Sequence, residues 1–223
     1  MSDNLLPYVE VNPDKPATAV VIWLHGLGDS GNGFAPIVPE LNLPEELAIR
    51  FVFPHAPIRA ITINNGYQMR AWYDIKSMEL DKRADAAGVR ESAELVKTLI
   101  EREIAQGIEA SRIVLAGFSQ GGVIALHLAT RFEQKLAGVM ALSTYMSEPD
   151  TLEQQAHPAN QQTPILMCHG RSDDVVPMAY GQQACRRLQQ CQYQVEWHDY
   201  PMQHNVCLDE LQTISNWLQA RLA

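Results

Sequence analysis

Runs of consecutive apolar residues alternate along the chain with longer segments in which apolar residues recur every three or four positions. A continuous apolar run of five or six residues is typical of a strand that is buried on both faces of a sheet. The clearest run is AVVIWL (residues 19–24), which is rich in β-branched residues and ends at His25-Gly26. We predict four more such strands, at residues 49–53 (IRFVF), 112–116 (RIVLA), 137–142 (AGVMAL) and 164–168 (PILMC).

Residues 192–198 (QYQVEWH) follow a different pattern, because apolar and polar side chains alternate there. Tyr193, Val195 and Trp197 share one face of the extended chain, and the residues between them are polar. Strict alternation indicates a strand with one face on the core and the other in solvent. We therefore predict an edge strand here.

Between these predicted strands, apolar residues recur with the spacing of helices. The clearest stripe has apolar residues at positions 89, 93, 96, 100 and 104, with Glu, Lys and Arg between them. Strands that alternate with helices indicate a mostly parallel sheet with right-handed crossovers and helices on both faces, the α/β class. No repeat or linker divides the chain, so residues 1–223 are expected to form one domain. Further helices are predicted at residues 122–131, 178–190 and 208–222.

Glycine, histidine and serine follow the predicted strands. In open α/β sheets, ligands bind beyond the carboxyl ends of the strands, where these residues would gather. The pattern therefore predicts an active site at that edge of the sheet. The segments concerned are 25–28 (HGLG), 54–55 (PH), 117–119 (GFS), 169–170 (HG) and 201–204 (PMQH).

The charge balance limits the partners of the protein. Lys and Arg number 17 against 26 Asp and Glu, a net charge of −9, and no basic run occurs. Binding to nucleic acid or to anionic lipid is therefore not expected. The sequence shows no signal-peptide pattern and no apolar run long enough to span a membrane, so we expect a cytoplasmic protein without stable membrane insertion. Whether it forms a homodimer is left open.

The four cysteines lie at positions 168, 185, 191 and 207 and form no CxxC pair. This spacing argues against a structural zinc site or a thioredoxin-like motif. We interpret them as reduced thiols that fill small apolar spaces. No metal or other cofactor is expected.

The sequence GFSQG at residues 117–121 matches the pattern G-x-S-x-G. A predicted buried strand precedes it and a predicted helix follows it, which is the context of a nucleophile elbow. In such a turn the glycines make room for a strained serine whose hydroxyl stands at the sheet edge. We predict that Ser119 is a nucleophile.

A serine hydroxyl needs a general base, which in this order of elements follows it in the chain. His198 lies inside the alternating strand, and His169 is expected to be a turn residue. His204 lies in a loop between the last strand and the last helix. His204 is therefore the predicted base.

The base in turn needs an orienting acid from a loop between the serine and the histidine. Asp173 and Asp174 both follow the strand at residues 164–168, and position in the loop slightly favours Asp173. Asp174 alone could be an exposed loop charge or a helix cap. Asp199 and Asp209 are weaker alternatives.

Backbone N–H groups must also stabilise the negative charge that develops on the carbonyl oxygen. Gln120, directly after the nucleophile, is one predicted donor. The loop after the first long strand, HGLGDSG at residues 25–31, offers the other, for which we choose Leu27.

Together these motifs make the chain resemble the phospholipase/carboxylesterase family of α/β-hydrolases, which includes acyl-protein thioesterases and small bacterial carboxylesterases. The resemblance implies an α/β-hydrolase fold without a large cap domain. It also implies Ser119 as nucleophile, His204 as base and Asp173 as acid, with Leu27 and Gln120 as oxyanion donors. The matching stretches are WLHGLGDSG (23–31), FPHAP (53–57), MRAWYDI (69–75), RIVLAGFSQGG (112–122), HGRSDDVVP (169–177) and MQHNV (202–206).

One residue departs from the family pattern, because Gln203 precedes the predicted catalytic histidine where members often have glycine. A bulkier neighbour there is expected to affect rate and substrate preference more than the triad.

The pocket wall is predicted less directly. Residues 55–87 show poor helical periodicity, and their MRAWYDI stretch carries large apolar side chains that could line a pocket. The alternative is that Trp72 and Tyr73 pack on the core. With the resemblance in view, we expect Trp72, Ile75 and Val176, beside Leu27, to line an apolar acyl pocket.

The expected activity is that of a serine carboxylesterase acting on short- to medium-chain esters. Its substrate would be a small-molecule ester or thioester. A lysophospholipase or an acyl-protein thioesterase is the close alternative, because the same acyl-enzyme chemistry handles thioesters. A catalytically silent binding module is the alternative from another class, which the intact Ser–Asp–His order disfavours.

Overall fold

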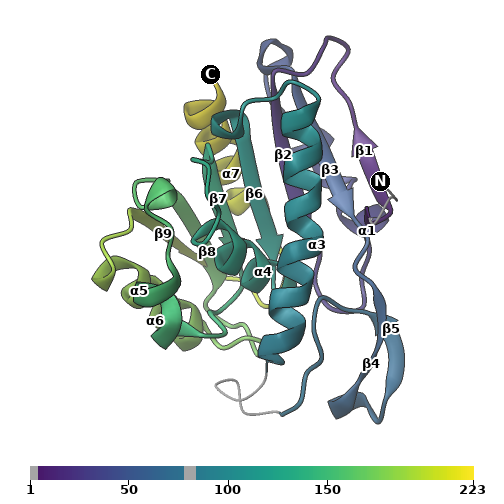
Figure 1. The fold of residues 1–223 in the computed structure, drawn as a ribbon, viewed down its shortest axis with the longest axis vertical. Helices are drawn as coiled ribbons and strands as arrows, with labels where there is room; N and C mark the ends of the chain where they lie inside the picture. Colours follow the sequence, from purple (N-terminus) through teal and green to yellow (C-terminus); the bar gives the residue numbers. More distant parts are fainter. Residues whose placement is uncertain (1–4, 78–83) are drawn as a thin grey trace.

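A mostly parallel sheet runs through the molecule in the computed structural model, which describes residues 5–77 and 84–223 (Figure 1). Its strand order within the described residues is β1-β3-β2-β6-β7-β8-β9, with all neighbouring pairs parallel except β1 and β3. The strands are β1 (Tyr8–Val11), β2 (Ala19–Leu24), β3 (Ile49–Pro54), β6 (Ile113–Phe118), β7 (Gly138–Leu142), β8 (Ile165–Gly170) and β9 (Val195–Tyr200).

All five continuous apolar runs form strands, which confirms those predictions. The residues of β2, β6, β7 and β8 are all buried, as expected where helices cover both faces of a parallel sheet. β9 is an edge strand as predicted, although it begins at Val195, later than expected. The four-residue strand β1 was not predicted, because it is too short to show a period.

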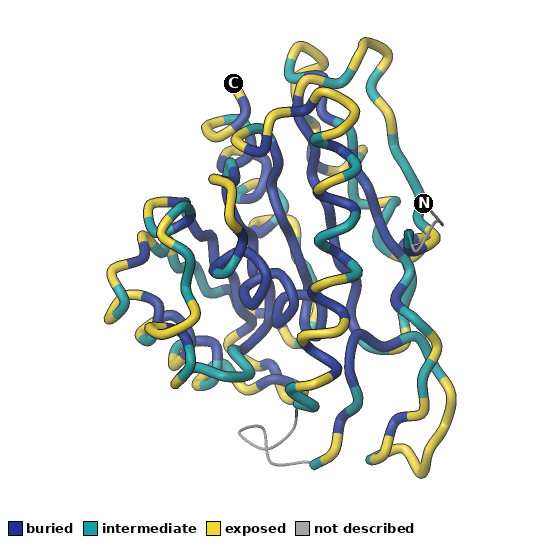
Figure 2. The backbone as a smooth tube through the Cα atoms, in the orientation of Figure 1, coloured by how far each residue is buried: buried dark blue, intermediate teal, exposed yellow. Residues whose placement is uncertain are grey.

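Helices cover the sheet on two sides, as predicted, and each side has its own apolar core (Figures 1 and 2). One core contains buried residues of α3 (Ala86–Ala105), α4 (Gln120–Ala129) and α6 (Met178–Gln190). The other contains buried residues of α7 (Leu208–Leu222) and is flanked by α1 (Gly31–Phe34) and α2 (Ile37–Glu40). A further short helix, α5, spans Leu152–Gln155. No helix in the described parts of the chain is long and apolar enough to cross a membrane.

A small antiparallel hairpin, β4 (Ile58–Ile61) and β5 (Tyr67–Arg70), projects beside the carboxyl ends of the sheet strands (Figure 1). It lies in the segment 55–87, for which the sequence predicted no regular element; residues 78–83 of that segment lie outside the described residues. The hairpin packs through a separate apolar cluster that includes Ile61, Ala71 and Ile75 and contacts Leu27. This cluster ties the loop after β2 to the hairpin.

Candidate active site

The turn from β6 into α4 holds Ser119 in a strained backbone conformation. Its φ is 54° and its ψ is −118°, in a region that non-glycine residues rarely adopt. The neighbouring β7 segment holds this conformation: the Ser119 N–H donates to the Leu142 carbonyl at 2.9 Å, and the Thr144 hydroxyl donates to the Ser119 carbonyl at 2.7 Å. Strain of this kind is typical of functional turns.

Two glycines of the motif provide clearance for this turn. A Cβ on Gly117 would overlap the backbone of Gly121 and Gly122, and a Cβ on Gly121 would overlap the carbonyls of Leu24 and His25. Both obstacles are backbone, which cannot rotate away. The strand, the turn and the helix can therefore pack this closely only with glycine at both positions.

A chain of hydrogen bonds links the three predicted triad residues. His204 Nε2 lies 2.9 Å from Ser119 Oγ, and His204 Nδ1 lies 2.7 Å from Asp173 Oδ2. These residues come from three different loops after β6, β8 and β9. Because parallel strands end at one edge, the sheet brings together residues that are up to 85 positions apart in sequence.

The Asp173 carboxylate is buried and remains ionised. Burial alone raises the pKa of Asp173, but the hydrogen bond to His204 and the backbone N–H groups of Val176 and Val175 outweigh it and lower the pKa. Those N–H groups donate to Asp173 Oδ1 at 2.8 and 3.0 Å, which leaves Oδ2 for His204. Asp174 is exposed. The structure thus distinguishes the two neighbouring aspartates: Asp173 contacts His204, whereas Asp174 is exposed.

The other two candidate histidines lie elsewhere. His198 is on β9, and its ring contacts the Glu196 carboxylate at 2.8 Å. His169 is not a turn residue, as the sequence had suggested, but a buried residue of β8. Its Nε2 lies 2.8 Å from the Val176 carbonyl, and burial lowers its pKa, so the neutral ring donates to that carbonyl. His169 therefore braces the loop that carries Asp173.

The two predicted oxyanion donors face the same space as Ser119. Leu27 and Gln120 both line the cavity in front of the serine. Neither backbone N–H donates to another of the described residues. They therefore form a pair of unoccupied donors beside the nucleophile, as stabilisation of an oxyanion requires.

The Gln120 side chain has a second role that the sequence did not suggest. Its Oε1 accepts the Trp72 N–H at 2.9 Å and its Nε2 donates to the Tyr73 carbonyl at 2.7 Å. The Trp72 ring in turn donates to the His25 carbonyl at 2.8 Å. The Gln120 side chain thus joins the nucleophile elbow to the segment after β5. Trp72 joins that segment to residues 25–31, the loop that carries Leu27.

A mainly apolar cavity of about 300 Å³ opens in front of Ser119 and His204. Ile75 and Val176 line it, as expected. Among the described residues Trp72 does not: its side chain is fully buried in the core, and the expectation that it forms the pocket wall is wrong. The adjacent Tyr73 lines the cavity instead. Lining residues that the sequence did not indicate are Phe34, Phe118, Tyr145 and Val175.

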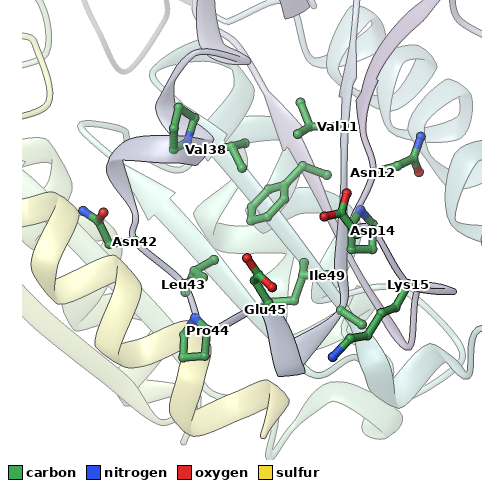
Figure 3. A pocket seen from close by; sticks show the side chains of 14 residues that line it. Val11, Asn12, Asp14, Lys15, Val38, Asn42, Leu43, Pro44, Glu45 and Ile49 are labelled. Carbon is green, nitrogen blue, oxygen red and sulfur yellow. The ribbon is translucent and has the colours of Figure 1, made fainter.

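A second cavity of about 300 Å³ lies away from the triad, where β3 begins and β1 ends (Figure 3). Val11, Leu43 and Ile49 contribute apolar surface, and Asp14 and Lys15 lie at its side. It contains no nucleophile paired with a base. The chemistry therefore favours the cavity in front of Ser119 as the active site. Among the described residues, no group of three or more His, Cys, Asp and Glu side chains is placed to hold a metal ion.

Comparison with known proteins agrees with this architecture. The family model described as phospholipase/carboxylesterase matches residues 7–222. An acyl-protein thioesterase 1 from Neurospora crassa is 40% identical over 214 residues, which cover 92% of this chain and 87% of the relative. The crystal structure of Arabidopsis thaliana SOBER1 superposes with a TM-score of 0.87 at 31% identity, covering 92% of this chain and 99% of that one. Esterase PE8 gives a TM-score of 0.82 at 27% identity, with coverage of 98% and 99%.

Proposed function

Because this chain belongs to the phospholipase/carboxylesterase family of α/β-hydrolases, and is therefore a serine hydrolase, we propose that it cleaves short- to medium-chain carboxylic esters with Ser119, His204 and Asp173. The hydrogen-bonded chain from Asp173 through His204 to Ser119, at the wall of an apolar cavity, carries this proposal. It supplies nucleophile, base and orienting acid in one connected geometry.

In the first half of the reaction, Ser119 Oγ attacks the acyl carbonyl carbon and His204 Nε2 takes the serine proton. Asp173 holds the imidazole with its Nδ1–H toward the carboxylate and stabilises the imidazolium. The Leu27 and Gln120 N–H groups stabilise the oxyanion; loss of one such donor typically costs about 10²–10³ in rate. His204 then donates the proton to the departing alcohol, and the acyl group remains on Ser119.

In the second half, water replaces the alcohol. His204 takes a proton from the water as its oxygen attacks the acyl-enzyme, and the same two N–H groups stabilise the second oxyanion. When the intermediate collapses, the Ser119–acyl bond breaks and His204 returns the proton to Ser119 Oγ. The carboxylic acid leaves, and the enzyme is restored.

The dimensions of the cavity support a short to medium acyl chain. Its volume of about 300 Å³ is at the lower end of the range of roughly 300–1,000 Å³ found for small-molecule sites. Ile75, Val176 and Phe118 provide apolar surface that would favour an acyl chain over a polar group.

The test is reaction with a fluorophosphonate probe together with hydrolysis of p-nitrophenyl esters. The wild type should be labelled and should hydrolyse butyrate and octanoate esters. Ser119→Ala should abolish labelling and lower kcat by about 10⁶-fold, as removal of the nucleophile does in another serine hydrolase. The exposed Ser111→Ala is the matched control and should behave as the wild type. Failure of the wild type to react with the probe or with any ester would refute the proposal.

The names of the relatives favour a second candidate, an acyl-protein thioesterase. The same acyl-enzyme steps apply, with a thiol in place of the alcohol as leaving group. A palmitoyl-thioester peptide assayed beside the esters separates the two candidates. A higher kcat/KM for the thioester peptide than for short esters would assign the enzyme to the second.

A further inference from the structure

Two tyrosines meet at the wall of the site cavity. The Tyr73 and Tyr145 hydroxyl oxygens lie 2.9 Å apart, and both side chains are buried. Tyr73 lies in the segment after β5, and Tyr145 lies three residues after the end of β7. The hydrogen bond therefore joins two loops that approach the cavity from different strands.

A larger cavity, of about 460 Å³, lies behind this wall. Tyr145 lines both cavities. The bridge between Ile75 and Ala84 gives a second, independent point of contact, because Ile75 lines the site cavity and Ala84 lines the larger one. The two spaces are therefore neighbours, separated in part by the Tyr145 side chain.

The backbone that carries Tyr145 is firmly attached to the nucleophile elbow. Ser143 has a φ of 47° and its N–H donates to the Cys168 carbonyl at 2.8 Å, while the Thr144 hydroxyl donates to the Ser119 carbonyl at 2.7 Å. These contacts fix the backbone just before Tyr145. The ring itself is buried and is held at its far end by the hydrogen bond to Tyr73, so it forms a barrier between the two cavities.

The two cavities also differ in chemistry. The site cavity is mainly apolar, whereas the larger one combines Met146, Tyr180 and Ala184 with the carboxylates of Glu148 and Asp150. An acyl chain that fills the first would reach the second only if the ring between them were absent. Its methylene groups would then find apolar surface on the α6 side.

We propose that Tyr145, held by its hydrogen bond to Tyr73, ends the acyl pocket and sets the upper limit of acyl-chain length. This inference rests on the proposed ester hydrolysis. Replacing Tyr145 with a small residue should join the two cavities and admit longer acyl chains. Because each methylene placed in an apolar pocket is worth roughly tenfold or more in kcat/KM, the specificity should change sharply beyond the limit.

The experiment compares kcat/KM for p-nitrophenyl esters from two to sixteen carbons in the wild type and in Tyr145→Ala. The ratio of dodecanoate to butyrate hydrolysis should rise at least about tenfold in the variant, mainly through a lower KM for the long ester. Tyr73→Phe, which removes the hydroxyl that bonds to Tyr145 and keeps the ring, should change the ratio in the same direction by less. Tyr180→Ala is the matched control, since Tyr180 lines the larger cavity but not the site cavity among the described residues, and its ratio should equal that of the wild type.

The outcomes separate this inference from the proposed function. If the wild type hydrolyses short esters and Tyr145→Ala keeps the same chain-length profile, the proposed role of Tyr145 is refuted, whereas the proposed esterase activity is supported. An equal rise in Tyr180→Ala would also refute it, because the effect would then not depend on the shared wall. If Tyr145→Ala does not fold, Tyr145→Leu, which keeps apolar bulk but shortens the side chain, takes its place in the same comparison. No ester hydrolysis and no probe labelling in the wild type would instead refute the proposed function.

Discussion

Ser119 and Glu210 are both held in unfavourable states, for different reasons. Ser119 has a strained backbone, which the hydrogen bonds from Thr144 and to Leu142 maintain. Glu210, in the first turn of α7, is fully buried, and its carboxyl oxygens have no side-chain hydrogen-bond partner among the described residues. The strain at Ser119 presents its hydroxyl to His204. The burial of Glu210 instead makes stability depend on pH.

Replacing Glu210 with glutamine should stabilise the protein, and more so at higher pH. Burial raises the pKa of Glu210 from its ordinary value of 4.5 to about 8. Between these values the folded protein keeps a proton that the unfolded chain releases, so this group lowers the free energy of unfolding as pH rises from 4.5 to about 8. We expect Glu210→Gln to raise that free energy by about 1–3 kcal/mol at pH 7.5 and by much less at pH 5.

Urea denaturation at the two pH values measures this difference. The exposed Asp209→Asn on the same helix turn is the control, and its effect should be the same at both. A Glu210→Gln effect that does not change with pH would show that the carboxyl does not hold its proton in the folded state.

At the scale of elements, the elbow and the segment after β5 act as one unit because of a single side chain. Gln120 begins α4, and its amide group makes both hydrogen bonds to Trp72 and Tyr73. The segment has no regular secondary structure to satisfy these buried backbone groups. The position of Tyr73 in the cavity wall therefore depends on α4, the helix that begins at Gln120.

Gln120→Met tests this connection, since methionine has a similar length but no amide. The Gln120 backbone N–H would remain, while the Trp72 N–H and the Tyr73 carbonyl would lose their partners. We expect a loss of about 1–3 kcal/mol in the free energy of unfolding and a higher KM for octanoate esters. Denaturation and steady-state kinetics measure the two effects. Unchanged stability and KM would show that the amide contacts do not hold the wall. Gln189→Met, at an exposed glutamine of α6 that does not line the site cavity, provides the control.

The sequence predicted the elements in the sheet well and the hairpin not at all. Apolar runs such as residues 19–24 reveal strands because burial on both faces leaves no room for polar residues. The β4–β5 hairpin is held by a small cluster with the distant Leu27, and exposed residues such as Ile58 and Tyr67 obscure its pattern. The hairpin is stabilised by contacts with residues distant in the sequence, and such contacts leave no periodic pattern within the hairpin itself.

At the scale of the whole molecule, the two apolar cores share the same strands. Successive residues of β2 alternate between them: Val20 and Ile22 belong to one, and Val21 and Trp23 to the other. Loss of either core would expose one face of every central strand. We therefore propose that residues 1–223 form one domain that unfolds as a unit.

This proposal predicts a single urea transition in which tryptophan fluorescence and far-UV circular dichroism have the same midpoint. Trp23 and Trp217 belong to one core, whereas Trp72 belongs to the other, against which Trp197 packs, so tryptophan fluorescence samples both faces of the sheet. The double variants Trp23→Phe/Trp217→Phe and Trp72→Phe/Trp197→Phe each leave tryptophan on one side of the sheet only, and their fluorescence and dichroism midpoints should still coincide. Separate midpoints for the two cores would show two independently unfolding parts.

The sequence by itself predicted the alternation of strands and helices, the elbow around Ser119 and a base at His204, whereas it left Asp173 and Asp174 both open as the acid. Buried strands and a strained glycine-flanked turn leave local patterns, so neighbouring residues are enough to recognise them. Only the tertiary structure turned Tyr73 rather than Trp72 toward the cavity and brought Tyr145 against it. Those placements depend on which side of an irregular loop faces a distant strand, and that is set by packing between segments about 70 residues apart.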